Sequence, residues 1–339
     1  MSQFKVLLLL IPLLVIAGCF PSSEIKTPEV LLQGQTMGTT YTIKFVDPKP
    51  GIDKVKLQAA IDVLLLEVNQ QMSTYIADSE LSQFNQHNQL SALEISSGLQ
   101  RVLNEAIRLW QLSEGKLDVS VGPLVNLWGF GPEYRIETAP TEQQLLAVKE
   151  NIGLENLTLS GNKLSKKVAG LYIDLSTIAK GYGVDIVAEY LQKQGIAGYL
   201  VEIGGEMRVK GFKATGELWH IAIEKPITEQ RSVHQVIVPK DNAVATSGDY
   251  RNYFEENGQR YSHIIDPDTG KPIDHKLVSV TVIHPSAMTA DGLSTAMMVM
   301  GEQKALAFAE KNKLAAYLIS KTDNGFVEQS TVKFMQYLK

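Results

Sequence analysis

The sequence predicts an α+β fold in which mixed, largely antiparallel strands pack with several helices. Helical patterns dominate the first two thirds of the chain, whereas the last third alternates strand-like runs with turns. Asn257-Gly258, between the runs NYFEE and QRYSHII, is a strong signal for an antiparallel hairpin. These features do not fit a regular βαβ series, and no tandem repeat of about 20 to 50 residues interrupts them.

The first twenty residues have the pattern of a bacterial lipoprotein signal. Lys5 precedes an apolar run from Val6 to Ala17, which is about the 7 to 15 residues of a signal-peptide core and too short for a comfortable membrane span. Small residues stand just before Cys19, and Ile16-Ala17-Gly18-Cys19 resembles a lipobox. We therefore expect cleavage after residue 18 and a lipid on the Cys19 sulfur; a plain signal peptide or a buried thiol are the alternatives.

The remaining chain has the composition of a folded, mildly acidic protein. We expect residues 19–30 to be a tether and residues 31–339 to form one large domain, or two intimately packed α+β subdomains. Cys19 is the single cysteine, so the mature chain has no internal disulfide and no thiolate metal site. A net charge of −5 without a basic block argues against nucleic acid as a partner.

The N-terminal part of the domain is expected to be mostly helical after an opening strand or hairpin at 31–45, which is rich in Thr, Tyr and Ile. Helical spacing of apolar residues and capping residues locate the helices that follow. These helices are expected at about 54–71, from Ser96 or Ser97 to near Gly115, from Thr141 over a short segment, and at about 176–194 with Gly195 closing the helix. Residues 171–175 are expected to form a strand before the last of them.

The later part is expected to be rich in strands. Alternating and β-branched runs predict them at 199–203, 207–211, 219–223, 234–238, 252–265, 277–283 and 314–320. Residues 290–312 are expected to be helical with a break near Gly301.

One candidate site is the stretch YIDLSTIAKGYGVD, which passes from strand to helix. It places Asp174, Thr177 and Lys180 at intervals of three near a predicted helix N-terminus, where free backbone N–H groups favour anions. The alternative is a helix capped by Ser176 or Asp174, with a solvated lysine.

Two glycine-containing stretches are weaker candidates. EIGGE (202–206) has paired glycines that would let a ligand or another strand approach the backbone, although without context a simple bulge or tight turn is the better explanation. ATSGDYRNYFE offers Ser247, Gly248 and Arg251 on a turn before a strand, and an ordinary polar turn is the alternative.

Two further stretches carry single polar residues in apolar surroundings. His263 lies in a strand-like run directly before a DPDTG turn, where a half-buried structural histidine is the alternative to a catalyst. Asp291 and Thr295 stand at i and i+4 at the start of an apolar helix, so they share one helical face. The alternative is that Asp291 caps this helix while Thr295 bonds back to a carbonyl.

Taken in order, eight motifs resemble the ApbE family, the FAD:protein FMN transferases. The motifs are QTMGTTY, MSTYIADSELSQFN, DVSVGPLVNLWGFG, IDLSTIAKGYGVD, VEIGGE, ATSGDY, YSHIIDPDTG and TADGLSTA, and they extend from about Gln33 to about Gly301. Members of that family cleave the pyrophosphate of FAD, release AMP and attach FMN through its phosphate to a threonine or serine hydroxyl of another protein. Acceptors include membrane subunits of Na⁺-translocating NADH:quinone reductase and related ion-pumping complexes.

The resemblance implies a site for FAD and Mg²⁺. The positions that match the family's FAD site are Met37, Tyr75, Asp118, Val119, Ser120, Asp174, Lys180 and Ile265. The positions that match its magnesium site are Thr177, Asp291 and Thr295. His263 matches the family's candidate base, and Ser294 stands where some members carry a further acidic residue near the metal. Tyr75 could stack on a ring of FAD, with core packing as the alternative.

The lipoprotein signal agrees with such an activity, because it would hold the enzyme at the periplasmic face of the inner membrane beside membrane-bound acceptors. Two other functions stay open at this point. An FAD pyrophosphatase would use the same site but give the phosphoryl group to water. A non-catalytic flavin- or solute-binding lipoprotein is the other, although a pure binder would not need an acid, a metal-type helix face and a strand histidine together.

Overall fold

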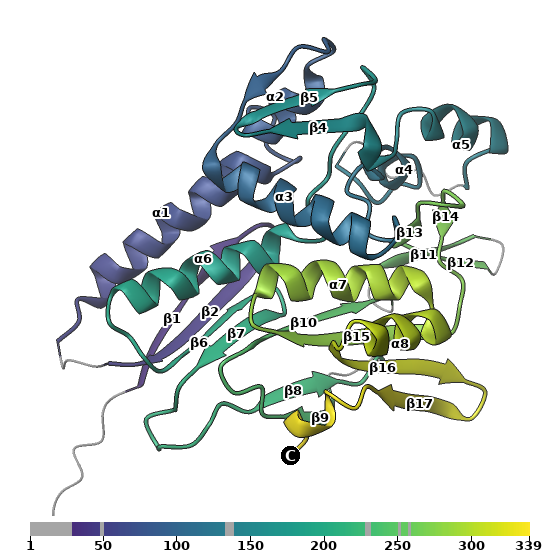
Figure 1. Cartoon of the computed structure of the whole chain (residues 1–339). Coiled ribbons are helices and arrows are strands. Elements are labelled where there is room, and N and C mark those ends of the chain that lie inside the picture. The colour runs from purple at the N-terminus through teal and green to yellow at the C-terminus, as the bar shows by residue number, and fades with distance from the viewer. Residues whose placement is uncertain (1–28, 48–50, 133–138, 228–231, 250–251, 257–258) are drawn as a thin grey trace, which may run out of the picture.

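The centre of the molecule is an eight-stranded antiparallel sheet. The computed structural model describes residues 29–47, 51–132, 139–227, 232–249, 252–256 and 259–339 (Figure 1). In spatial order the strands are β1 (Glu29–Thr36), β2 (Thr39–Val46), β6 (Tyr199–Ile203), β7 (Glu206–Lys210), β10 (Ala243–Gly248), β15 (Leu277–His284), β16 (Ala315–Thr322) and β17 (Gly325–Ser330). The predicted α+β class is therefore confirmed. The expected signal peptide, Cys19 and most of the expected tether lie outside the described residues.

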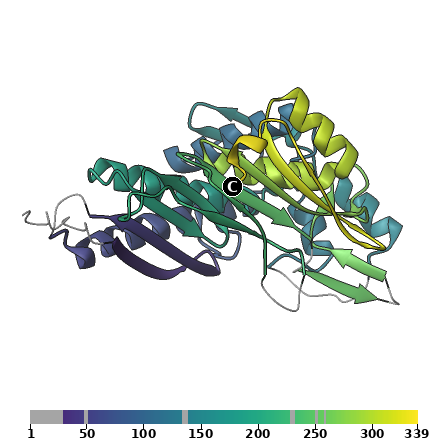
Figure 2. The ribbon, with the colours of Figure 1, turned by 90° about the horizontal axis from the view of Figure 1, so that it is seen from below.

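Helices cover one face of this sheet, and a small hairpin covers part of the other (Figures 1 and 2). The helices on the first face are α1 (Lys54–Met72), α3 (Ser97–Leu112), α6 (Ala179–Lys193), α7 (Ala287–Met300) and α8 (Glu302–Lys311). Strands β8 (Ile221–Glu224) and β9 (Val233–Ile237) form the hairpin, and the turn η2 (Met335–Tyr337) lies beside it. Apolar side chains fill both interfaces, because strand residues alternate between the two faces.

Smaller elements lie on the far side of the helices from the sheet and beyond one end of the helices (Figure 1). They are α2 (Glu80–Gln86), β3 (Leu93–Glu94), α4 (Gly122–Leu127), α5 (Glu142–Lys149), η1 (Leu154–Asn156), β4 (Leu157–Ser160), β5 (Lys163–Lys166), β11 (Tyr253–Glu256), β12 (Gln259–Ser262), β13 (Ile265–Asp266) and β14 (Lys271–Pro272). Strands β11 and β12 pair as the hairpin predicted there, although its Asn257-Gly258 turn lies outside the described residues. None of the helices described is both long and apolar enough to span a bilayer.

Local capping signals locate the helix starts well. Asp53 accepts a hydrogen bond from the Lys56 N–H at the start of α1, and Ser96 accepts one from Leu99 N–H at the start of α3. Thr141 forms a capping box at the start of α5. The predicted break between the last two helices is also confirmed, since Gly301 separates α7 from α8 with φ of +75°.

Two predictions around residue 175 are wrong. Residues 171–175 are not a strand, although the side chains of Leu171, Ile173 and Leu175 are fully buried. The Asn85 side chain forms hydrogen bonds with both backbone groups of Ile173. Its Nδ2 donates to the Ile173 carbonyl, and its Oδ1 accepts from the Ile173 N–H. This segment therefore pairs with no strand in the part of the chain that the structure describes. The following helix begins at Ala179, not at residue 176, and neither Asp174 nor Ser176 caps it.

Helix α6 receives its cap from a neighbouring helix. Its N-cap residue, Ile178, supplies no side-chain hydrogen bond. The Gly181 N–H, in the first turn, instead donates to Asp291 Oδ2 of α7 at 3.0 Å. Asp291 does not cap its own helix, because α7 begins at Ala287 with Ser286 as N-cap. The alternative in which Asp291 caps its own helix is therefore wrong, because Asp291 caps α6 instead.

Helix α7 is capped in the same manner by α6. The buried Asp185 of α6 accepts from the N–H groups of Ala287 at 3.0 Å and Met288 at 3.1 Å. Its two oxygens also accept from Ser286 Oγ and Arg208 Nη1. The two helices thus complete each other's first turns, where orphan N–H groups would otherwise stay unpaired.

Candidate active site

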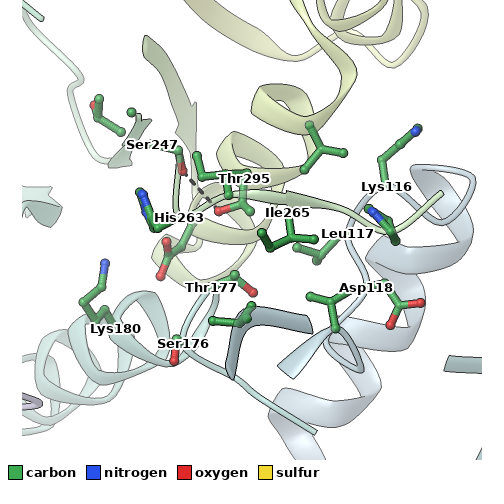
Figure 3. A pocket seen from close by; sticks show the side chains of 18 of the residues that line it. Lys116, Leu117, Asp118, Ser176, Thr177, Lys180, Ser247, His263, Ile265 and Thr295 are labelled. Carbon is green, nitrogen blue, oxygen red and sulfur yellow. Dashed lines mark hydrogen bonds between the residues drawn. The ribbon is translucent and has the colours of Figure 1, made fainter. Parts of the chain in front are cut away.

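A cavity of about 420 Å³ lies where the first turn of α6 meets one face of α7. Asp291, Thr295 and Val299 of α7 line it, and their spacing of four places them on one side of that helix. The opposite walls come from residues 116–118, the β6–β7 turn, the end of β10 and the segment 263–267. In Figure 3, His263 and Lys180 lie on one side of the pocket and Asp118 on the other, with Thr177 and Thr295 between them.

A second cavity of about 820 Å³ adjoins the first. Its walls include Met37, the last turns of α1, Tyr75 and Asn252, and it shares Ser176 and Lys180 with the smaller cavity. Tyr75 is 69% exposed, so core packing does not explain this side chain. Each volume lies in the range of about 300 to 1,000 Å³ that organic ligands occupy, and the shared wall would let one extended ligand fill both cavities.

Lys180 supplies a fixed positive charge where the two cavities meet. Its Nζ lies 2.7 Å from Oε1 of Glu206, whose side chain is 5% exposed. Burial alone would lower the pKa of Lys180, but the carboxylates of Asp291 and Glu206 raise it above its ordinary value. The ammonium therefore stays charged, and the alternative of a solvated surface lysine is wrong.

Oxygen atoms suited to a hard cation gather on the wall formed by α7 and the start of α6. Thr177, Asp291 and Thr295 all line the smaller cavity. Burial raises the pKa of Asp291 to about 7, which a nearby cation would oppose by favouring the charged form. Thr177 Oγ1 is buried and has no hydrogen-bond partner among the described residues, as expected for an atom whose partner is a bound group.

This set fits magnesium better than a transition metal. Among the described residues, no three His, Cys, Asp or Glu side chains group together as a metal cluster. Mg²⁺ needs only one or two carboxylates because it keeps several waters and binds substrate phosphates. Ser294 does not line the cavity; its hydroxyl donates to the Asp291 carbonyl and is bonded to Ser247 Oγ. Ser247 Oγ is also 3.1 Å from Thr295 Oγ1, so this hydroxyl chain orients Thr295 (Figure 3).

His263 is a possible base, because one of its ring nitrogens has no hydrogen-bond partner among the described residues. Its Nδ1 lies 3.0 Å from the carbonyl oxygen of Asn252. A carbonyl can only accept, so Nδ1 carries the hydrogen and Nε2 keeps its lone pair. Burial lowers the pKa of His263 below its ordinary value, and the charges of Lys180 and Arg260 lower it further. The imidazole is therefore neutral near pH 7, as a general base must be.

The other FAD-site candidates divide into lining and supporting residues. Asp118 and Ile265 line the smaller cavity and Met37 lines the larger one. Val119 and Ser120 are buried and do not line either cavity. Ser120 instead donates to Asp118 Oδ1 and accepts from the N–H of Gly153, so it holds the wall in place.

Asp174 does not line either cavity and instead forms hydrogen bonds with backbone groups of other residues. Its Oδ1 accepts from the N–H of Ser176 at 2.8 Å, and its own N–H donates to the Val119 carbonyl at 2.7 Å. Asp174 therefore ties the segment before α6 to the segment 118–120. The roles of these residues toward FAD stay predictions.

The structure adds residues that pattern reasoning did not single out. Glu206 lines the cavity directly after the Gly204-Gly205 turn, and the turn itself is the tight one that EIGGE offered as an alternative. An acid directly after two glycines was the available signal. Asn252 acts through its carbonyl, which no side-chain pattern reveals. Arg251, named from the ATSGDYRNYFE stretch, lies outside the described residues.

The fold is an antiparallel sheet covered by helices, and two adjoining cavities lie beside the mutually capped helices α6 and α7. These features define an α+β protein with a pocket for an extended organic ligand. The chain belongs to the ApbE family, whose model matches residues 37–318. The resemblance recognised from the eight motifs is thereby confirmed.

Individual relatives match nearly the whole chain. The sequence is 56% identical over 333 residues to the FAD:protein FMN transferase of Vibrio cholerae, covering 98% of both chains. It is 38% identical to the protein of the same name from Escherichia coli K12, covering 99% of this chain and 98% of that one. The solved flavin transferase ApbE from Vibrio cholerae superposes with a TM-score of 0.86 at 56% identity, covering 92% of this chain and 99% of that one.

Proposed function

We propose that this protein is an FAD:protein FMN transferase that uses Mg²⁺ and attaches FMN to a threonine or serine hydroxyl of an acceptor protein. One observation carries the proposal. A lysine ammonium, a neutral histidine and three side chains with oxygens suited to a hard cation line one cavity. A second cavity shares Lys180 with the first, and it is large enough to hold the rest of an extended dinucleotide. The names of the relatives support the same activity.

In this mechanism the acceptor hydroxyl attacks the phosphorus on the FMN side of the pyrophosphate. His263 Nε2 accepts the hydroxyl proton while the new P–O bond forms, and the P–O bond to AMP breaks. Lys180 opposes the negative charge on the phosphate oxygens, and such electrostatic stabilisation is a main source of rate in phosphoryl transfer. Packing around His263 and the Asn252 carbonyl keep the imidazole in the tautomer that can accept the proton.

Magnesium would be held by Asp291, Thr177 and Thr295. When bound, it supplies a second positive charge against the pyrophosphate. Without the metal ion, the described residues that line the smaller cavity include two lysines and three carboxylates. This excess of negative over positive side chains does not attract a pyrophosphate by itself. The cation therefore explains how an acidic pocket can accept a doubly charged ligand.

The test is transfer to a protein. Purified protein, FAD and Mg²⁺ are incubated with an acceptor domain carrying its threonine, or with the same domain carrying valine at that position. We expect a fluorescent flavin band after denaturing electrophoresis with the threonine form alone, together with AMP in equal amount. Release of free FMN and AMP without any labelled protein would favour the pyrophosphatase, and neither product would favour a flavin-binding lipoprotein.

We also propose that a lipid on Cys19 holds the enzyme at the periplasmic face of the inner membrane. The proposal is supported by the lipobox-like Ile16 to Cys19 and by the position of β1 at the edge of the sheet, where the chain enters the fold. A subunit of Na⁺-translocating NADH:quinone reductase or a related ion-pumping complex would then be within reach as the acceptor.

A further inference from the structure

Glu206 occupies a place that a tight turn creates for it. It is the first residue of β7, and the turn before it has Gly204 at φ +59° and Gly205 at φ +105°, conformations that other residues rarely adopt. A Cβ on Gly204 would lie 2.8 Å from Thr39 Cγ2 and 3.4 Å from Lys180 Cδ. The contact with Thr39 is too close for a side chain, whereas the one with Lys180 is an ordinary packing distance, so the turn packs tightly against Thr39 while it brings the Glu206 carboxylate to the cavity wall.

The two oxygens of Glu206 have different surroundings. Oε1 forms the 2.7 Å ion pair with Lys180, whereas Oε2 is buried and lacks a hydrogen-bond partner in the part of the chain that the structure describes. Within that same part of the chain, no carboxylate other than that of Glu206 lies within ion-pair distance of Lys180. A buried carboxylate left half-satisfied costs folding free energy, which indicates a role beyond stability.

The alternative partner for Lys180 is Asp291. Its carboxylate is close enough to raise the pKa of Lys180, yet no direct ion pair joins the two. A lysine side chain has a flexible four-carbon stem, so an ammonium released from Glu206 could turn toward Asp291. It would then neutralise a carboxylate proposed for the cation and leave the boundary between the cavities.

We propose that Glu206 is a positioning residue that holds the Lys180 ammonium at the boundary between the two cavities and away from Asp291. This inference rests on the proposed function, because the boundary is where the FAD pyrophosphate would pass. Glu206 itself does not touch the reacting atoms; it acts through Lys180.

Three substitutions separate the hydrogen bond from the charge. Glu206→Ala removes the partner of Lys180, and we expect kcat/KM for FAD to fall about 10- to 100-fold, the range of a lost hydrogen bond to a charged group. Glu206→Gln keeps an oxygen that accepts from the ammonium, so it should lose less than about tenfold. Glu206→Asp keeps the charge but withdraws the oxygen by one methylene, so it should resemble the alanine variant. Glutamine as damaging as alanine would overturn the proposal.

A double-mutant cycle with Lys180→Ala tests whether Glu206 acts through the lysine. We expect the double variant to bind FAD and transfer flavin no worse than Lys180→Ala alone, because the interaction is already lost. If the losses of the two single variants multiply in the double variant, Glu206 acts independently of Lys180, and the proposal is overturned. The matched control is Glu202→Gln, which removes a neighbouring negative charge, keeps an oxygen that accepts from the Gly205 N–H, and should leave FAD affinity unchanged.

Two further measurements keep the outcomes distinct. FAD affinity is measured by equilibrium dialysis with Mg²⁺ and no acceptor, so the cycle can be completed even if the wild type transfers no flavin and the proposed function fails. Thermal unfolding of every variant identifies any loss of fold. If Glu206→Ala does not fold, the comparison of glutamine with aspartate decides the question.

Discussion

Replacing Gly181 with alanine tests whether the close crossing of α6 and α7 holds the site together. An added Cβ would lie 2.4 Å from the carbonyl oxygen of Ala287 and 2.8 Å from Met288 Cα. Both atoms belong to a helix backbone, which cannot rotate aside as a side chain can. The helices must therefore separate locally, and the Gly181 N–H must move relative to Asp291 Oδ2.

The expected magnitude follows from three opposing contributions. Alanine in place of glycine in a helix stabilises by about 1 kcal/mol. Overpacking costs about 1 to 3 kcal/mol. Weakening of the Asp291 cap on α6 costs about 0.5 to 2 kcal/mol. Gly181→Ala should therefore lower the free energy of unfolding by roughly 0.5 to 4 kcal/mol.

Gly183→Ala is the matched control in the same helix. Its added Cβ would meet Met37 Cε at 2.8 Å, the far end of a flexible side chain that can shift. We expect its free energy of unfolding to stay within about 1 kcal/mol of the wild type. Urea unfolding followed by circular dichroism compares the two variants, with flavin transfer measured in native buffer. Equal stability of the two variants would show that the helices do not approach as closely as described.

Three other substitutions and one pH profile test the remaining assignments. Asp291→Asn keeps an oxygen for the Gly181 N–H, so thermal stability should be nearly unchanged while the Mg²⁺ concentration for half-maximal transfer rises sharply; wild-type transfer at limiting Mg²⁺ would refute the metal assignment. His263→Ala should lower single-turnover transfer by about 10² to 10⁴ with FAD still bound. Because the pKa of His263 is lowered, Nε2 gains a proton only below about pH 6.5, so wild-type transfer should fall there and not above it. Cys19→Ser should yield an unlipidated precursor or a soluble periplasmic form, and a lipid-modified intact mass would exclude the lipobox assignment.

The sequence predicts those parts of the fold that depend on local signals. Asp53, Ser96 and Thr141 cap helices through contacts within three residues, so their helix starts could be located. The segment 171–175 could not be assigned correctly, because the competing hydrogen bonds come from Asn85, far away in the chain. Its buried alternation is typical of a strand, and tertiary contacts decided otherwise.

The candidate site was predictable in part for the same reason. Asp291 and Thr295 share a helical face, and the structure places both on the cavity wall. The partner of Lys180 was not predictable, because Lys180 lies on helix α6 and Glu206 on strand β7. Supporting roles such as that of Ser120, which bonds Asp118 and the Gly153 N–H, also depend on contacts between segments.

The mutual capping of α6 and α7 has a consequence for the order in which the molecule acquires its shape. The contact between Gly181 and Asp291 closes a loop of 110 residues, and the contact between Asp185 and Ser286 closes one of 101 residues. Closing such a loop lowers the entropy of the chain before the stabilising contact has formed. Topologies dominated by distant contacts therefore form slowly. The first turn of α6 therefore receives its Asp291 cap only once α7 is in place, so the wall of the smaller cavity depends on contacts more than 100 residues apart in the chain.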